Sequence, residues 1–172
     1  TVIDQSTGEV KAIVGGRGDK TASKTLNRAT DTTRQPGSTF KILASYSAAL
    51  DAGGLTLASV QDDAPYTYAG ANGKSVSNYD KRYRGFTTLR EAITDSINIV
   101  TVKTLAQVGV SLGWQYVQEY GFTTVDSRDM NEALALGGIT QGVSNLELTA
   151  AYAAIANQGT YIKPKFYTKI LD

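Results

Sequence analysis

One run of apolar and small residues, Phe40–Leu50, constrains the fold of this chain more than any other stretch. Its large side chains fall around most of a helix circumference rather than along one stripe, so we expect the helix to be surrounded by protein. Pro36–Gly37 suits the approach to a helix, because proline has a fixed φ and no backbone donor. Gly53–Gly54 supplies a left-handed C-terminal cap. The sequence therefore predicts a buried helix that forms the axis of the fold.

A serine and a lysine, Ser38 and Lys41, lie three residues apart at the start of this helix. Three residues is slightly less than one turn, so the two side chains share a face and come within hydrogen-bond reach. Apolar surroundings favour a neutral lysine, which can take a proton from a hydroxyl. The first turn also offers backbone donors and the positive end of the helix dipole, which favour developing negative charge on Ser38. The competing interpretation is a serine cap beside an ordinary surface lysine.

The composition excludes several classes of chemistry. The chain has no Cys and no His, which excludes cysteine nucleophiles, Ser-His-Asp triads and zinc sites built on those residues. Acid–base work must then fall to Lys, Asp, Glu, Tyr or water. The formal net charge is +1, so no basic excess suggests nucleic acid. We therefore predict no nucleic-acid partner, no metal and no cofactor.

The length of 172 residues and the 41% hydrophobic content predict about one globular domain, without an internal repeat. No run approaches the roughly 18 apolar residues of a membrane span. Two capping boxes, Thr88-x-x-Glu91 and Ser144-x-x-Glu147, mark helix starts. The predicted elements are a hairpin over 2–14, a surface loop over 17–34, the central helix, an extended ordered loop over 55–84, helices at 88–95, 99–109, 111–120, 131–136 and 144–157, and a last strand over 165–171. Trp114 is expected in the core.

A second polar pair, Ser96-x-Asn98, falls between two predicted helices. Serine and asparagine are favoured at helix caps, and capping alone explains them unless Ser38 lies close by. With Ser38 close, the Ser96 hydroxyl can pass a proton between Lys41 and a leaving amine. The Asn98 amide can then donate to and accept from a substrate amide.

These motifs carry a resemblance to a known family. Ser38-x-x-Lys41 followed by Ser96-x-Asn98 resembles the first two motifs of the penicillin-recognising serine enzymes. The surrounding phrases are similar to the transpeptidase domain of class A, bifunctional penicillin-binding proteins, over nearly the whole chain. Those phrases are the stretches 4–12, 27–30, 34–41 and 148–164.

The resemblance implies an α+β, β-lactamase/transpeptidase-like fold, with a helical subdomain beside an antiparallel sheet that is incomplete in this chain. It implies that Ser38 attacks the D-Ala-D-Ala bond of a peptidoglycan stem peptide, with Lys41 as base. Ser96 would shuttle the proton and Asn98 would hold the peptide amide. An amine of a neighbouring stem then takes the acyl group, whereas β-lactam antibiotics acylate Ser38 and stay.

One family feature is missing from the sequence. The third motif, Lys-Thr-Gly or Lys-Ser-Gly, occurs nowhere, because Lys24-Thr25 precedes Leu26 and Lys74-Ser75 precedes Val76. In the family that strand binds the substrate carboxylate and supplies one oxyanion-hole amide. We therefore expect residues 1–172 to be the N-terminal part of one transpeptidase domain, inactive alone and partnered by the C-terminal remainder. The resemblance places a membrane-anchored parent at the extracytoplasmic face of the bacterial membrane.

Two other interpretations stay open at this point. The first is a serine β-lactamase or β-lactam sensor of the same superfamily, in which deacylation or signalling replaces cross-linking. The second is a non-catalytic structural or interaction domain in which Ser38 and Ser96 only cap helices.

Overall fold

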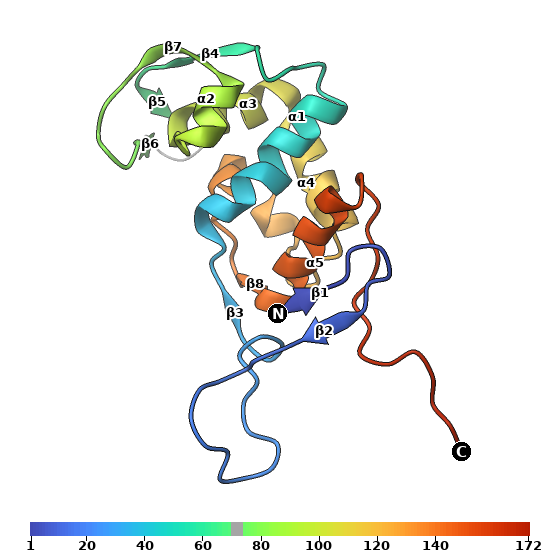
Figure 1. Ribbon diagram of the computed structural model, residues 1–172. Coiled ribbons are helices and arrows are strands. Elements are labelled where there is room, and N and C mark those ends of the chain that lie inside the picture. The colour runs from blue at the N-terminus through green and yellow to red at the C-terminus, as the bar shows by residue number, and fades with distance from the viewer. Residues whose placement is uncertain (70–73) are drawn as a thin grey trace. The chain divides into compact units, whose positions relative to one another are not determined.

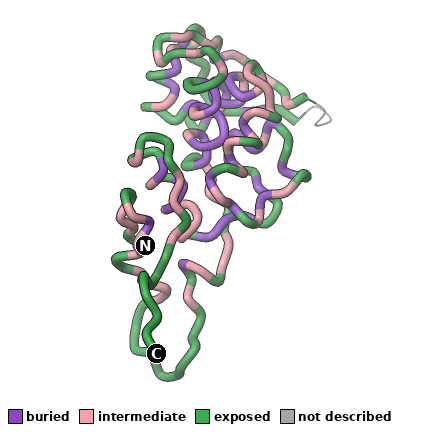
Figure 2. The backbone as a smooth tube through the Cα atoms, turned by 90° about the vertical axis from the view of Figure 1, so that its right-hand side faces the viewer, coloured by how far each residue is buried: buried purple, intermediate pink, exposed green. Residues whose placement is uncertain are grey.

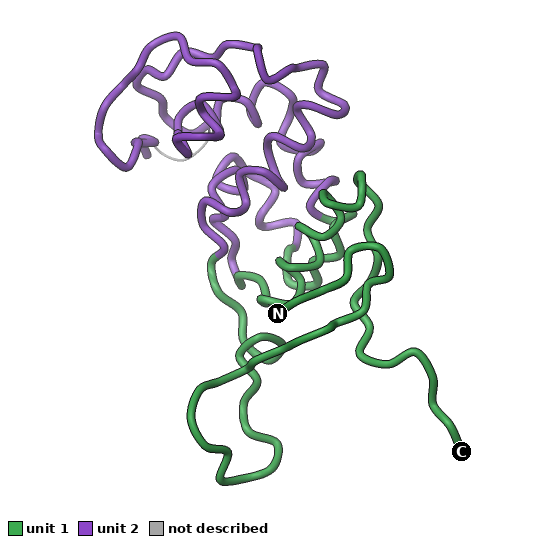
Figure 3. Tube along the Cα trace, viewed as in Figure 1, with its two compact units in different colours: residues 1–35, 118–125, 141–172 green, residues 36–117, 126–140 purple. Residues whose placement is uncertain are grey.

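The computed structural model describes residues 1–69 and 74–172, drawn as a ribbon in Figure 1. The described chain divides into two compact units (Figure 3). Unit 1 comprises residues 1–35, 118–125 and 141–172, and unit 2 comprises residues 36–117 and 126–140. Each unit is therefore described by itself below.

The described strands are short and pair only in antiparallel fashion, in four two-stranded sheets. Helices and antiparallel strands together confirm the predicted α+β class. The pairs are β1 (Val2–Ile3) with β2 (Val10–Ala12), β3 (Thr33–Arg34) with β8 (Val143–Ser144), β4 (Val60–Asp63) with β7 (Gly85–Thr88), and β5 (Tyr66–Thr67) with β6 (Ser75–Val76).

The helices lie close to their predicted positions. Across residues 1–69 and 74–172, none of them combines the length and apolar character needed to cross a bilayer. They are the 3-10 turns η1 (Gly37–Thr39), η3 (Ser127–Asp129) and η4 (Glu132–Leu136), the π-helical segment η2 (Ile42–Tyr46), and the α-helices α1 (Ser47–Asp51), α2 (Leu89–Thr94), α3 (Asn98–Val108), α4 (Val110–Glu119) and α5 (Asn145–Ala156).

The central helix of unit 2 is buried as predicted, but it is not a plain α-helix. It begins as η1, widens into η2 and ends as α1. The Ile42 carbonyl accepts both the backbone N–H and the hydroxyl of Ser47, which stabilises the wide turn. Apolar side chains around most of the helix are inaccessible to solvent, and Figure 2 colours buried residues such as these purple. They are Phe40, Leu43, Ala44, Tyr46, Ala48 and Ala49.

Two elements of unit 2 hold the central helix. The Ser45 hydroxyl donates to the Thr101 carbonyl of α3 at 2.9 Å, and the Tyr46 hydroxyl lies 2.8 Å from the Thr101 hydroxyl. Helix α4 approaches through Gly113, where an added Cβ would lie 2.3 Å from the Ala44 carbonyl oxygen. Both contacts fix the helix because buried polar groups need partners and backbones cannot overlap.

Unit 1 contains the predicted N-terminal hairpin, in which Val2 pairs with Ala12 and Ile3 with Val10. The second capping box is also present, since Ser144 and Glu147 exchange hydrogen bonds at the start of α5. The predicted strand over 165–171 is wrong. In this stretch only Lys165 forms a bridge, to Glu9. The apolar side chains that follow are exposed, so no burial of apolar surface stabilises a strand there.

The predicted loop over 55–84 is also partly wrong. Strands β4, β5 and β6 lie within it. Strands β5 and β6 pair with each other, whereas β4 finds its partner β7 only beyond the loop. Such distant pairing leaves little local signal. Gly70 and Gly73, assigned to this loop, lie outside the described residues. Trp114 is half-buried rather than fully buried, and its indole N–H donates to the Asp126 carbonyl at 3.3 Å.

Gly113→Ala tests the close approach of α4 to the central helix. Alanine gains about 1 kcal/mol in helix propensity. Its methyl group must displace the Ala44 carbonyl, however, and overpacking of this kind costs about 1–3 kcal/mol or more. We expect a net loss in the free energy of unfolding measured in urea. Ser111→Ala, at an exposed position of α4, is the control and should not lose stability. A stabilised Gly113→Ala protein would contradict the packing.

Candidate active site

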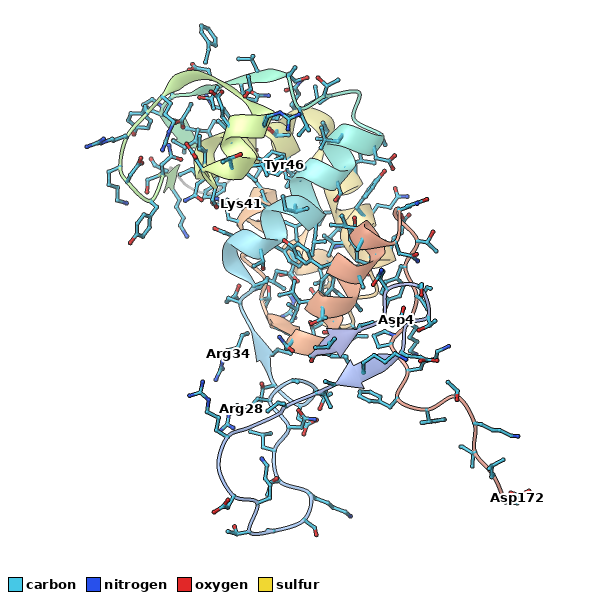
Figure 4. All side chains as sticks on the ribbon, in the orientation of Figure 1. Asp4, Arg28, Arg34, Lys41, Tyr46 and Asp172 are labelled. Atoms are coloured by element: carbon cyan, nitrogen blue, oxygen red, sulfur yellow. The ribbon has the colours of Figure 1, made fainter. Side chains whose placement is uncertain are left out.

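Lys41 is the buried centre of the candidate site. Its side chain follows the η1 turn on the central helix, where Figure 4 labels it near Tyr46. Lys41 is 3% exposed. Its Nζ donates to Ser96 Oγ at 2.9 Å, to the Ser96 carbonyl at 2.5 Å and to Asn98 Oδ1 at 2.6 Å. An ammonium group has three N–H donors, so these three acceptors satisfy all of them.

Burial lowers the pKa of Lys41 from 10.5 to about 8, because an enclosed ammonium loses its hydration. The neutral amine that forms above this pH has two N–H groups and one lone pair. The carbonyl and amide oxygens can only accept, so they retain the two N–H groups. The lone pair is then available to a hydroxyl, which can donate as well as accept.

Ser96 occupies a left-handed position between α2 and α3, with φ = 53°. Its N–H donates to the Ile93 carbonyl, and the Ile97 N–H donates to the Ala92 carbonyl. This is the hydrogen-bond pattern of a Schellman motif, in which the left-handed residue is usually glycine. Serine is strained there, and its hydroxyl and carbonyl both point to Lys41.

Asn98 is the first residue of α3 and connects two elements through its amide. Its Oδ1 accepts from Lys41, while its Nδ2 donates to the Ser77 carbonyl at 2.8 Å. These opposite partners define which end of the amide is oxygen. One N–H and one oxygen lone pair of the Asn98 amide are still available to a ligand.

Ser38 is exposed on the η1 turn. It lines a pocket of about 720 Å³ together with Ser96 and Asn98. The turn itself is held by η4, since an added Cβ at Gly137 would lie 2.6 Å from the backbone of Gly37. The remaining lining residues are Ser77, Asn78, Tyr79, Lys81 and Asp95.

The structure therefore brings the four predicted residues to one place, in a somewhat different arrangement. Lys41 is hydrogen-bonded to Ser96 and Asn98, and within the described chain no hydrogen bond joins it to Ser38. The side chains of Ser38 and Ser96 do not cap the starts of η1 and α3, because the N-cap residues there are Pro36 and Ile97, and neither helix start has a side-chain cap hydrogen bond. This arrangement counts against the capping-only interpretation. In the described part of the chain, no three acidic side chains gather as metal ligands.

Sequence reasoning missed Asn78 and Asp63, two buried polar residues behind the site. Asn78 contacts the start of α3, and Asp63 contacts Asn78. Both lie in a stretch rich in polar and turn residues, so nothing local distinguishes them. The isolated Ile97 before α3 is the one available signal, because a helix that starts after isoleucine needs a cap from elsewhere.

Comparison with known proteins gives a consistent result. The family model described as penicillin binding protein transpeptidase domain matches residues 1–172. Penicillin-binding protein 1F of Bacillus subtilis (strain 168) is 43% identical over 170 residues, covering 99% of this chain and 22% of that protein. Penicillin-binding protein 1A of Neisseria flavescens is 41% identical over 175 residues, covering 99% of this chain and 21% of that protein. The chain thus spans about a fifth of these relatives' length.

Solved structures agree with this fold. A 2.6 Å crystal structure of penicillin-binding protein 1A from Haemophilus influenzae superimposes with a TM-score of 0.73 and 33% identity, covering 83% of this chain and 21% of that one. PonA1 from Mycobacterium tuberculosis in complex with penicillin V gives a TM-score of 0.78 at 22% identity, covering 94% of this chain and 44% of that one. At that identity the second likeness shows the fold alone, which confirms the predicted transpeptidase-like class.

The left-handed backbone of Ser96 makes a stability prediction. Ser96→Gly and Ser96→Ala both remove the hydroxyl, so the difference between them reports on the backbone. We expect the glycine variant to be more stable than the alanine variant by about 1 kcal/mol in urea unfolding, since only alanine is strained at positive φ.

The matched control is the same pair of substitutions at Ser111, an exposed residue in the first turn of α4. There the order should reverse, with alanine more stable than glycine. Equal stability of the two Ser96 variants would contradict the Schellman geometry.

Proposed function

The chain belongs to the family of penicillin-binding protein transpeptidase domains, and from this premise we propose that it carries the acyl-transfer residues of a D,D-transpeptidase of peptidoglycan cross-linking. The observation that supports the proposal most strongly is the buried Lys41. It is hydrogen-bonded to Ser96 and Asn98 at a pocket that Ser38 also lines. A lysine with a lowered pKa, hydrogen-bonded to one hydroxyl and close to the pocket that a second hydroxyl lines, is suited to acyl transfer in a chain without histidine.

In the proposed first step, Ser38 Oγ attacks the carbonyl carbon between two terminal D-alanines. The neutral Lys41 amine takes the hydroxyl proton. The tetrahedral intermediate then collapses, the C–N bond breaks, and the proton passes through Ser96 to the leaving amine. The products are an ester on Ser38 and free D-alanine.

In the second step, an amine of a neighbouring stem peptide attacks this ester. Its proton returns along Ser96 and Lys41 to Ser38, which restores the hydroxyl and leaves a new amide cross-link. The unused donor and acceptor of Asn98 hold the amide of the stem peptide meanwhile. A β-lactam follows the first step alone, because its opened ring stays attached to Ser38.

We also propose that these residues act in a longer, membrane-anchored protein at the extracytoplasmic face of the bacterial membrane. The relatives are about five times as long as this chain, which supports a longer parent protein. In the proposed assembly, the carboxylate-binding strand and its oxyanion-hole amide come from a C-terminal remainder. Residues 1–172 then contribute the nucleophile and the proton-transfer groups.

Ser38→Ala tests the nucleophile in the full-length protein. We expect covalent labelling by a fluorescent penicillin to be lost, with little change in thermal unfolding, because Ser38 is exposed. Ser75→Ala, an exposed serine of β6, is the control and should label like the wild type. Labelling that survives Ser38→Ala would make the nucleophile assignment wrong. Rapid release of the label from the wild type would favour the β-lactamase interpretation instead.

The pH dependence of acylation tests Lys41 as the base. Only the neutral amine accepts a proton, so the acylation rate constant should rise about tenfold per pH unit below pH 8 and level off above it. The measurement is stopped-flow acylation by a fluorescent penicillin between pH 6 and about 9.5. Lys41→Arg is the control, since arginine stays protonated, and it should be slow at every pH. A flat wild-type profile would exclude Lys41 as the base.

A further inference from the structure

Helix α3 carries Asn98 and follows Ser96 directly, yet it starts without a cap of its own. The residue before it is Ile97, whose side chain has no acceptor and is buried. The first N–H groups of a helix have no partner within the helix. Buried N–H groups must find one elsewhere, because an unpaired buried donor is costly.

Asn78 supplies that partner from another part of unit 2. Its Oδ1 accepts from the N–H of Asn98 at 3.1 Å and from the N–H of Ile99 at 3.2 Å. Asn78 is 3% exposed and precedes α3 by 20 residues. It therefore does at long range what serine or asparagine usually does as a local N-cap.

The other end of the Asn78 amide is fixed by a buried carboxylate. Its Nδ2 donates to both oxygens of Asp63, at 2.8 and 3.0 Å, and to the Arg82 carbonyl at 2.8 Å. Asp63 is fully buried on β4 and also accepts from the Arg84 N–H at 2.9 Å. The Asn78 side chain can hardly turn, because both of its ends are committed within a buried network.

We infer that Asn78, held by Asp63, is a positioning residue that keeps Ser96 and Asn98 in place against Lys41. Residues 77 and 78 both contact Asn98. The Ser77 carbonyl accepts from Asn98 Nδ2, and Asn78 Oδ1 accepts from the backbone N–H of Asn98 at the start of α3. If the Asn98 side chain rotated away, Lys41 would lose Asn98 Oδ1 as a hydrogen-bond acceptor. The inference rests on the proposed function, which gives Lys41, Ser96 and Asn98 their roles.

The first experiment compares Asn78→Ala with Ser144→Ala in the full-length protein. Each variant removes the side-chain cap of one helix, α3 in unit 2 or α5 in unit 1. Acylation by a fluorescent penicillin separates two effects. Loss of folded protein lowers the amplitude of labelling, whereas misplacement of the groups lowers the rate constant of the protein that still labels.

We expect the acylation rate constant to fall about 10- to 100-fold in Asn78→Ala, as for other small displacements of catalytic groups. Ser144→Ala should lose amplitude at most. Hydrogen exchange at the amides of Asn98 and Ile99 should accelerate only in Asn78→Ala. An unchanged rate constant or unchanged exchange in Asn78→Ala would overturn the inference.

A charge-swap pair tests the link to Asp63. Asn78→Asp keeps an acceptor for α3 but places a second carboxylate against Asp63, so acylation should slow. Adding Asp63→Asn restores a donor opposite the new carboxylate. We expect the double variant to recover about tenfold in rate over Asn78→Asp, a non-additive rescue that a purely structural loss would not give. Equal rate constants for the double variant and for Asn78→Asp would exclude the Asn78–Asp63 contact as the link that positions Asn98.

The outcomes distinguish this inference from the function on which it rests. A wild-type protein that does not label at Ser38 would contradict the proposed function, and the positioning role with it. If the wild type labels at Ser38 and the Asn78→Ala variant has the same acylation rate constant, only the positioning role is contradicted.

Discussion

The buried contact of Lys41 with Ser96 and Asn98 is the interaction on which the organisation of unit 2 depends. An enclosed ammonium group is tolerated only if hydrogen bonds replace its water, and here three oxygen atoms do so. Those oxygens come from the turn between α2 and α3 and from the first residue of α3. The central helix, that turn and the start of α3 must therefore be placed together, or the lysine is left unpaired. This requirement gives a physical reason for the buried hydroxyl contacts that join Ser45 and Tyr46 to Thr101.

Unit 2 departs from ideal geometry where its polar residues meet. Ser96 takes a left-handed conformation in which glycine would be unstrained, and the central helix widens into a π segment directly after Lys41. Both features cost stability, and the left-handed turn places Ser96 at the pocket that Ser38 lines. The surrounding packing compensates, since Leu89, Ala92, Ile97 and Val100 form a buried cluster around the same turn. Local strain set in a well-packed frame is expected where function, rather than stability, determines the residue.

Much of this fold follows from local signals in the sequence. The capping boxes at Thr88 and Ser144 determine helix starts by contacts three residues apart, and the apolar run of the central helix determines its burial. The four motif residues were predicted from residue type, spacing and the family resemblance together, and their catalytic roles stay a prediction. The contacts of Asn78 with Asp63 and with the start of α3 could not be predicted, since the partners lie 15 to 21 residues apart in a polar segment without periodicity. The strand assigned to 165–171 failed for a related reason, because an apolar pattern does not reveal whether a pairing partner exists.

The chain separates two requirements of acyl transfer that are often discussed together. In the proposed mechanism, proton transfer depends on the pKa of Lys41, which burial within unit 2 lowers before any substrate arrives. Oxyanion and carboxylate stabilisation, by contrast, act on the substrate, and the sequence holds no Lys-Thr-Gly or Lys-Ser-Gly motif for them. The buried Asp63–Asn78 contact matters to the surroundings of Lys41, because Asn78 accepts from the first N–H groups of α3, the helix that carries Asn98.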